Sequence, residues 1–287
     1  MEARSIIQRY MSLDKFLFII EKHSLFLTKM SKFDDQLEGS LTALDYLDKS
    51  NEAGIFDNAI NNCFSVYGET PTEREKRLRN SELVTKTLNE ATFDTPFGRF
   101  SKNETPKIFA KCRENIYVSC WHSSDFECSA MWQLYGKASN ALCIVTTVDK
   151  LKTQIVNADN LQYKFQLEDV QYLDHSKAEF TNNVIQPFIS KALPFSFEKE
   201  LRLIAYNPQI DIKNTKDDNS NGFIIRIHSL SELIDKIIIS PSSEPSFKQR
   251  VEKLCCKHGL NIEIKDSSLK RTRIESVWDS MEQLQEE

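Results

Sequence analysis

The residues best suited to chemistry in this sequence are two glutamates and an arginine near position 200. Glu198, Glu200 and Arg202 are spaced two apart, and side chains two apart on a β-strand share a face, about 6.5 Å from one another. Two such carboxylates raise each other's pKa unless a cation lies between them, and Arg202 is placed to be that cation. The group can bind ribose hydroxyls, stabilise a cationic transition state or act as a general base.

The same spacing has a purely structural interpretation. A solvent-exposed strand face that carries one ion pair is common, and it contributes little to stability. On the pattern alone, this exposed face is the favoured interpretation. Catalytic roles for Glu200 and Glu198 are therefore a hypothesis, and it requires that both carboxylates open into a shared, partly dry site.

A second acidic group lies near the N-terminus. Asp34, Asp35 and Glu38 offer hard oxygen ligands of the kind that divalent metals prefer. The segment lacks the alternating ligand pattern of a calcium-binding loop, so a capped turn is favoured and no metal site is assigned. A metal-dependent nuclease that combines these acids with Glu198 and Glu200 is kept as a further functional alternative.

An aromatic pair in the middle of the chain is a third candidate. Trp132 and Tyr135 are three apart in an expected helix, so they lie on one face. Core packing is the commoner role of such a pair, and the alternative is an aromatic surface on which nicotinamide, adenine or another base stacks. The nearby Cys120 and His122 have no motif around them that indicates nucleophilic catalysis.

The order of apolar patterns predicts an α+β fold, with a mixed, mostly antiparallel sheet core flanked by helices and interrupted by a helical insertion. Helices are expected over 12–23, 129–135, 176–193 and 247–258. Strands are expected over 25–28, 116–121, 141–148, 161–167, 197–206, 222–227 and 261–265. We expect a single domain over 1–270, with the insertion at about 42–106 (93–106 as a loop) and a polar tail over 271–287.

Composition narrows the functional class. The 287 residues carry a net charge of −5, so net charge does not indicate nucleic-acid binding. The seven cysteines are irregularly spaced and form no CxxC pair, which favours reduced thiols in a cytoplasmic protein. We expect neither a signal peptide nor a membrane partner. The chain also lacks the glycine-rich motifs of nucleotide-binding parallel sheets.

Five short segments, taken in order, resemble a bacterial family catalogued as domain of unknown function 2971. They are Phe33-Asp34-Asp35-x-x-Glu38, Ser119-Cys120-Trp121, Met131-Trp132-x-x-Tyr135, Lys191 with Phe197-Glu198-x-Glu200-x-Arg202, and Ile237-Ile238-Ile239-x-Pro241. The resemblance covers the chain from about Tyr10 to Lys265. This sequence departs from the family where Asn-Asp-Pro-Phe-Glu is usual at Asp34–Glu38 and where Cys-Phe-Ser is usual at Cys120–His122.

A fold-level likeness adds an activity. The order of parts is similar to that of ADP-ribosyltransferases, in which an early Arg or His, a middle-strand Ser or Tyr and a late Glu bind NAD. That likeness implies Arg9, Ser119 and Glu198-x-Glu200 as counterparts, with Arg202 beside them. Glu200 would hold the nicotinamide ribose and stabilise oxocarbenium character.

In the same likeness, Glu198 orients the acceptor, and Trp132 or Tyr135 covers the nicotinamide. The likeness then implies an NAD-using ADP-ribosyltransferase or NAD glycohydrolase, acting as an effector in a toxin or phage-defence system with a protein target or antitoxin partner. The alternative is a non-catalytic sensor or binding module that recognises a protein, nucleotide or other small-molecule ligand through the same residues.

Overall fold

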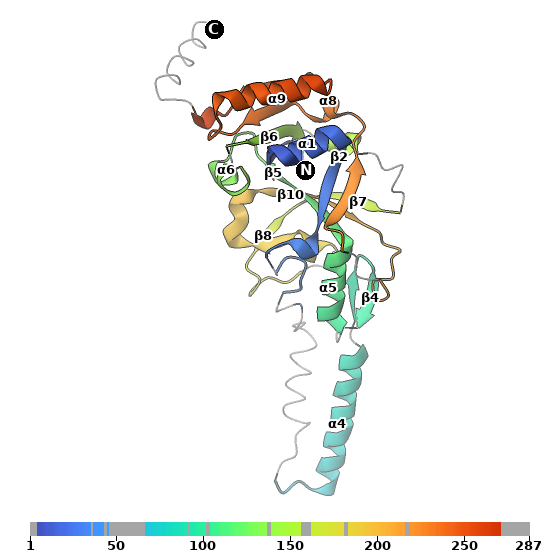
Figure 1. The fold of residues 1–287 in the computed structure, drawn as a ribbon. Coiled ribbons are helices and arrows are strands. Elements are labelled where there is room, and N and C mark those ends of the chain that lie inside the picture. Colours follow the sequence, from blue (N-terminus) through green and yellow to red (C-terminus); the bar gives the residue numbers. More distant parts are fainter. Residues whose placement is uncertain are drawn as a thin grey trace.

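The computed structural model describes residues 5–35, 37–42, 45, 67–90, 92–101, 104–136, 139–155, 162–180, 183–215 and 219–270. Within them, one large and mostly antiparallel sheet forms the core, with helices on both sides (Figure 1). The predicted α+β fold class is therefore confirmed. The strands of this sheet are β1 (Ile6–Ser12), β2 (Ser24–Lys29), β5 (Ile116–Ser123), β6 (Ala141–Thr147), β7 (Lys164–Asp169), β10 (Glu200–Tyr206), β11 (Gly222–Arg226), β12 (Lys236–Ile239) and β13 (Glu263–Asp266).

Strand β5 organises the sheet. One of its edges pairs with β10 along the whole strand, and β2 and β1 share the other edge. The register sets Glu200 opposite His122 and Arg202 opposite Cys120, while Gln8 of β1 lies opposite His122 from the other side. Because cross-strand partners share a face, Gln8, His122 and Glu200 form one polar row across three strands.

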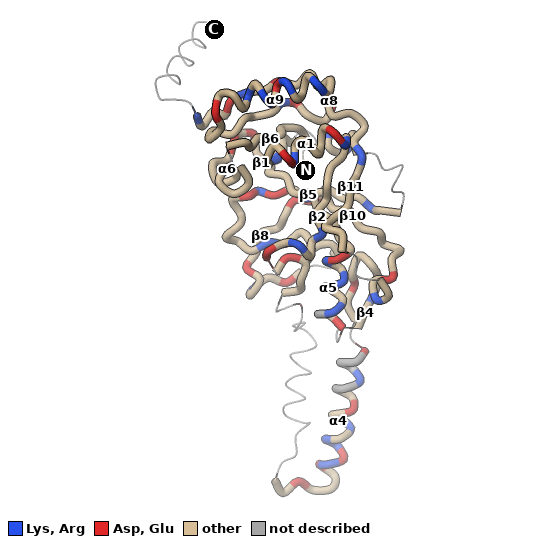
Figure 2. Tube along the Cα trace, in the orientation of Figure 1, with Lys and Arg blue, Asp and Glu red and all other residues tan. Residues whose placement is uncertain are grey.

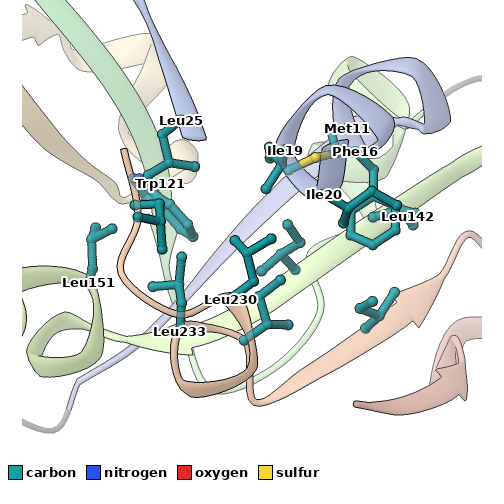
Figure 3. Close-up of a cluster of buried hydrophobic side chains, with 14 of the residues drawn as sticks. Met11, Phe16, Ile19, Ile20, Leu25, Trp121, Leu142, Leu151, Leu230 and Leu233 are labelled. Atoms are coloured by element: carbon teal, nitrogen blue, oxygen red, sulfur yellow. The ribbon is translucent and has the colours of Figure 1, made fainter. Parts of the chain in front are cut away.

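One face of the sheet carries the largest apolar core. Helices α1 (Leu13–Lys22), α7 (Val148–Gln154), α8 (Leu230–Leu233) and α9 (Pro245–Lys257) cover it. Figure 3 shows Trp121 of β5 among leucines from the surrounding elements, and Phe16 of α1 beside Leu142 of β6. Because successive side chains of a strand alternate between faces, every second residue of β5 and β10 points into this water-free core. The residues between them point to the opposite face.

The opposite face is covered by shorter elements. Helix α5 (Thr105–Asn115), the 3₁₀ turns η1 (Met30–Lys32) and η4 (Gln186–Ile189), and α6 (Ser129–Tyr135) pack there in two smaller apolar clusters. Strand β8 (Gln171–Leu173) pairs in parallel with β9 (Ser190–Ala192), and the 3₁₀ helix η5 (Leu193–Glu198) follows at once. These short elements border the charged side chains described below.

Two local predictions were wrong, and one strand was missed. Residues 93–106, expected as a loop, include the hairpin of β3 (Thr92–Thr95) and β4 (Gly98–Ser101), which Phe93 anchors by stacking on Phe109 at 5.4 Å. The helix expected over 176–193 is absent from the described part of that range, where Pro187 lies in η4 instead. Strand β1 was not predicted at all, although it pairs with β6 over its whole length.

The insertion is helical where it is described. Helix α4 (Pro71–Glu90) extends away from the sheet (Figure 1), and residues of both charge signs are interspersed along it, as along α9 (Figure 2). Residues 43–44 and 46–66, and the tail over 271–287, lie outside the described residues. No helix in the described ranges has the length and apolar character needed to cross a membrane.

Candidate functional site

Five charged side chains meet on the sheet face opposite the largest core. Glu38 follows η1, Lys191 lies on β9, Glu198 ends η5, and Glu200 and Arg202 begin β10. None is more than 8% exposed, and Arg202 is 0% exposed. The favoured interpretation of an exposed strand face was therefore wrong. We call these five residues the charge cluster.

Arg202 is the centre of the charge cluster. Its Nε and Nη2 donate to the two carboxylate oxygens of Glu200 at 2.7 and 3.1 Å. Nη2 also donates to Glu38, and Nη1 donates to the backbone carbonyl of Phe188 at 2.8 Å. Every nitrogen of the guanidinium thus has an acceptor, which is the condition under which a buried charge is tolerated.

Lys191 completes the charge cluster from the other side. Its Nζ lies 2.6 Å from Glu198 Oε2, 3.6 Å from Glu200 Oε2 and 3.7 Å from Glu38 Oε1. Three carboxylates therefore face two cations, and the formal charge is −1. Phe195 lies over the ammonium, at 4.8 Å from Nζ to the ring centroid.

The second oxygen of Glu198 is much less constrained. Glu198 Oε1 has one described partner, the Tyr135 hydroxyl, which donates across 3.5 Å. Tyr135 is 48% exposed and Phe195 is 37% exposed. Glu198 thus lies between the buried ion pairs and two aromatic rings that reach solvent.

A left-handed residue brings Glu198 into the charge cluster. Lys199 has φ 41° and separates η5 from β10, so Glu198 does not continue the strand as predicted. The turn is held by the Ser123 amide, which donates to the Lys199 carbonyl at 2.8 Å, and by His122, whose Nδ1 lies 2.5 Å from the Glu198 carbonyl. The turn folds Glu198 back beside Glu200 instead of extending it along the strand face.

Burial and pairing shift the pKa values in opposite directions. Burial and the nearby Glu200 carboxylate together raise the pKa of Glu38 more than Arg202 and Lys191 lower it. For Glu200 burial also raises the pKa, but Arg202 and Lys191 outweigh it, and the pKa lies below its usual value. Burial lowers the pKa of Lys191, and the carboxylates around it raise that pKa above the usual range.

These directions predict different costs for two isosteric variants. The pKa of Glu200 lies below 4.5, so its contribution to stability is present above pH 4.5 and is lost as the pH falls through the folded-state pKa. The raised pKa of Glu38 means that its ionisation costs stability as the pH rises. We therefore expect Glu200→Gln to lower the free energy of unfolding more than Glu38→Gln at neutral pH, with the difference shrinking in acid. Urea denaturation across this pH range measures both, and equal costs at every pH would contradict the assignment.

Gly39 places Glu38 in the charge cluster. Its φ is +77°, and a Cβ there would lie 2.9 Å from Arg113 Cγ, 3.0 Å from Met30 Sδ and 3.2 Å from Phe188 Cδ1. We expect Gly39→Ala to lower the free energy of unfolding by about 1–3 kcal/mol from backbone strain, plus the cost of the displaced neighbours. Gly68→Ala is the matched control, because Gly68 has φ +86° with nothing within 4 Å. Equal losses in the two variants would show that the close packing around Gly39 costs nothing.

Of the two predicted aromatic residues, the structure brings only Tyr135 to the charge cluster, where it contacts Glu198. Trp132 is buried elsewhere. Its ring lies edge-to-face on Tyr10 at 4.7 Å between centroids, and its Nε1 donates to Glu127 at 3.0 Å. Trp132 therefore packs in the core and supports α6. It does not present an open surface for a ligand.

Arg9 and Ser119 are not brought to Glu200. Ser119 lies opposite Leu203, whose side chain belongs to the largest core. The Arg9 guanidinium lies over the ring of Trp121, at 5.5 Å from the centroid, and Trp121 belongs to the same core. Both therefore lie on the sheet face opposite Glu200, because successive residues of a strand alternate faces.

The acidic loop is divided as well. Asp34 is exposed, Asp35 Oδ1 accepts from the Leu37 amide at 2.8 Å, and Glu38 alone reaches the charge cluster. The capped turn that was favoured at this loop is present. No group of acidic, cysteine or histidine side chains suited to a metal occurs in the described residues.

Three residues of the site were not given their roles from the sequence. Lys191 was noted within the resemblance but received no role, and Glu38 was considered only as a metal ligand. Cys120, opposite Arg202 in the register, hydrogen-bonds the Glu200 carboxylate through its thiol, and burial raises its thiol pKa well above the usual value. The one available signal was the order of the family-like segments, since Glu38, Cys120 and Lys191 all belong to them.

Comparisons of the chain with family models, with curated proteins and with solved structures found no match.

Proposed function

We propose that this protein cleaves the N-glycosidic bond of a nicotinamide dinucleotide, with Glu198 as the carboxylate that faces the reacting ribose. The observation that supports it is a buried charge cluster of net charge −1 whose least constrained carboxylate oxygen lies beside Tyr135. Cleavage of this bond develops positive charge on the ribose carbon, and a nearby carboxylate stabilises that charge.

Glu198 is better suited to this role than Glu200. Both oxygens of Glu200 are engaged by Arg202, and its carboxylate also accepts from Cys120. Glu198 is held through one oxygen by Lys191 and leaves Oε1 with a long contact to the Tyr135 hydroxyl. Lys191 thereby orients Glu198, while Oε1 remains available. Glu198 thus takes the ribose-facing role that the ADP-ribosyltransferase likeness gave to Glu200.

Hydrolysis is proposed ahead of transfer to a protein. The expected NAD-binding counterparts, Arg9 and Ser119, lie on the other face of the sheet. The residues that remain at the site are Glu198, Lys191 and Tyr135, and in this proposal they provide charge stabilisation and substrate contact. Water is then the simplest acceptor.

The test is incubation of the purified protein with NAD. We expect free nicotinamide and ADP-ribose in equal amounts, measured by chromatography, in proportion to protein concentration. The same incubation with cellular extract detects transfer to a macromolecule. Absence of nicotinamide release in both, together with no NAD binding by calorimetry, would refute the proposal.

The contacts of the site also favour a second candidate, a non-catalytic module that binds a nucleotide. Each carboxylate of the charge cluster has a cationic partner within 4 Å, an arrangement that can hold a ligand without activating it. This candidate is supported if calorimetry shows NAD binding, if Tyr135→Ala weakens that binding, and if no nicotinamide is released.

A further inference from the structure

His122 lies at the edge of the charge cluster but belongs to none of its ion pairs. It is 2% exposed and lies opposite Glu200 in the β5–β10 register. Its Nδ1 is 2.5 Å from the Glu198 backbone carbonyl, and its ring meets Tyr10 edge-on at 6.1 Å between centroids. It is thus fixed beside both glutamates by a strand register, a hydrogen bond and a ring contact.

The hydrogen bond determines the tautomer of His122. A carbonyl oxygen only accepts, so Nδ1 carries the proton and donates to Glu198. In the neutral ring, Nε2 is then an acceptor with a free lone pair. Burial lowers the pKa of His122, with the nearby Lys199 acting in the same direction, and this outweighs the Glu198 contributions that raise it. The neutral form is therefore the resting form at neutral pH.

Within the described residues, the Nε2 atom of His122 makes no hydrogen bond to another group, since the ring bonds through Nδ1. Several buried side-chain nitrogen and oxygen atoms in the described residues have no hydrogen-bond partner. They include both ring nitrogens of His175 and the Ser119 hydroxyl, but no atom of His122. His122 Nε2 therefore differs from the two ring nitrogens of His175, which are buried without a partner.

The proposed reaction needs one proton acceptor and no proton donor. When water attacks the ribose carbon, the electron pair of the breaking C–N bond stays on the pyridinium nitrogen, so nicotinamide leaves neutral. The one proton to be removed is that of the attacking water. Glu200, Glu38 and Glu198 each form an ion pair with Arg202 or Lys191, whereas His122 belongs to none of these pairs.

We propose that His122 is the general base of this reaction, with Nε2 accepting the proton of the attacking water while Nδ1–H holds the Glu198 backbone. The base role rests on the proposed function, whereas the tautomer does not. The proton then passes from the imidazolium to solvent, and the products are nicotinamide, ADP-ribose and one proton.

The decisive variant is His122→Asn. Its amide nitrogen can replace the Nδ1–H donor to the Glu198 carbonyl, but the side chain supplies no base. We expect kcat for nicotinamide release to fall about 10²-fold, with KM for NAD nearly unchanged. His228→Asn, at an exposed histidine, should match the wild-type rate. If the role were only structural, His122→Asn would keep the wild-type kcat, and that result would overturn the proposal.

The pH profile gives a second readout. Activity of the wild-type protein should fall as the pH drops through the pKa of His122, because the base must be neutral, and His122→Asn should lack this limb. The groups that face His122 are Glu198 and Lys199 from the turn, Glu200 from β10 and Tyr10 from β1. A limb that persists unchanged in His122→Asn would assign it to one of these groups and overturn the proposal.

Nitrogen NMR separates failure of this inference from failure of the proposed function. In ¹⁵N-histidine-labelled protein, with the His122 signals identified by their loss in His122→Asn, we expect a protonated Nδ1 and an unprotonated Nε2 at neutral pH. The opposite tautomer, or a doubly protonated ring, overturns the inference whatever the activity. The expected tautomer in a protein that leaves NAD intact would refute the hydrolase and the base role together, while leaving the described site geometry correct.

Discussion

Arg202→Met is expected to lower the free energy of unfolding by about 3–5 kcal/mol, because it leaves buried carboxylates without their main cation. Arg202 is 0% exposed and pairs with Glu200 and Glu38. Lys191 lies at 3.6 and 3.7 Å from those two glutamates and cannot neutralise both of them and Glu198. The change is measured by urea denaturation near neutral pH.

Two comparisons make this result specific. Arg99→Met removes an exposed pair with Asp94, and we expect no measurable change in stability. Combining Arg202→Met with Glu38→Gln and Glu200→Gln should recover part of the loss, since the charges that lacked a partner are then removed. If Arg202→Met were as mild as Arg99→Met, the charge cluster would not be a buried ion network.

Glu198→Gln is expected to reduce nicotinamide release about 10³-fold, because the neutral amide cannot stabilise positive charge on the ribose. The amide is isosteric, and Lys191 keeps Glu38 and Glu200 within 4 Å, so the variant should fold. Circular dichroism and urea denaturation establish that it does. Initial rates at saturating NAD measure the effect on kcat.

Two further variants define the role of Glu198. Glu198→Asp keeps the negative charge but moves it one methylene away from the ribose. We therefore expect a rate of nicotinamide release between those of the wild-type protein and Glu198→Gln. Glu104→Gln, which alters an exposed pair with Lys213, should leave the rate unchanged. A Glu198→Gln protein that releases nicotinamide within about tenfold of the wild-type rate would remove Glu198 from the reaction.

Much of the architecture follows from local pattern. The strand over 116–121 and the apolar run over 141–148 correspond to β5 and β6, and the helix over 129–135 corresponds to α6. Alternation and helical spacing are local signals, and in these segments tertiary packing agrees with them. The helical pattern was misleading over 176–193. There the apolar side chains around Pro187 are buried, but they belong to a 3₁₀ turn and a short strand.

The composition of the site was also partly predictable. Glu198, Glu200 and Arg202 stand out by spacing, and their proximity in the chain made their proximity in space a sound expectation. The position of Glu198 was not predictable from alternation, because the left-handed conformation of Lys199 separates Glu198 from the strand, which begins only at Glu200. Lysine carries no sequence signal for that conformation, which glycine and asparagine usually adopt.

By itself, then, the sequence determined the α+β class, the principal strands and the chemical types at the candidate site. Only the tertiary structure decided that these charges are buried and which of them meet. Glu38 and Arg202 are 164 residues apart in sequence, and the β5–β10 register that turns Ser119 away from Glu200 and His122 toward it is a long-range pairing. Local patterns report which side chains share a face of one element, but not which face of the sheet the rest of the chain covers.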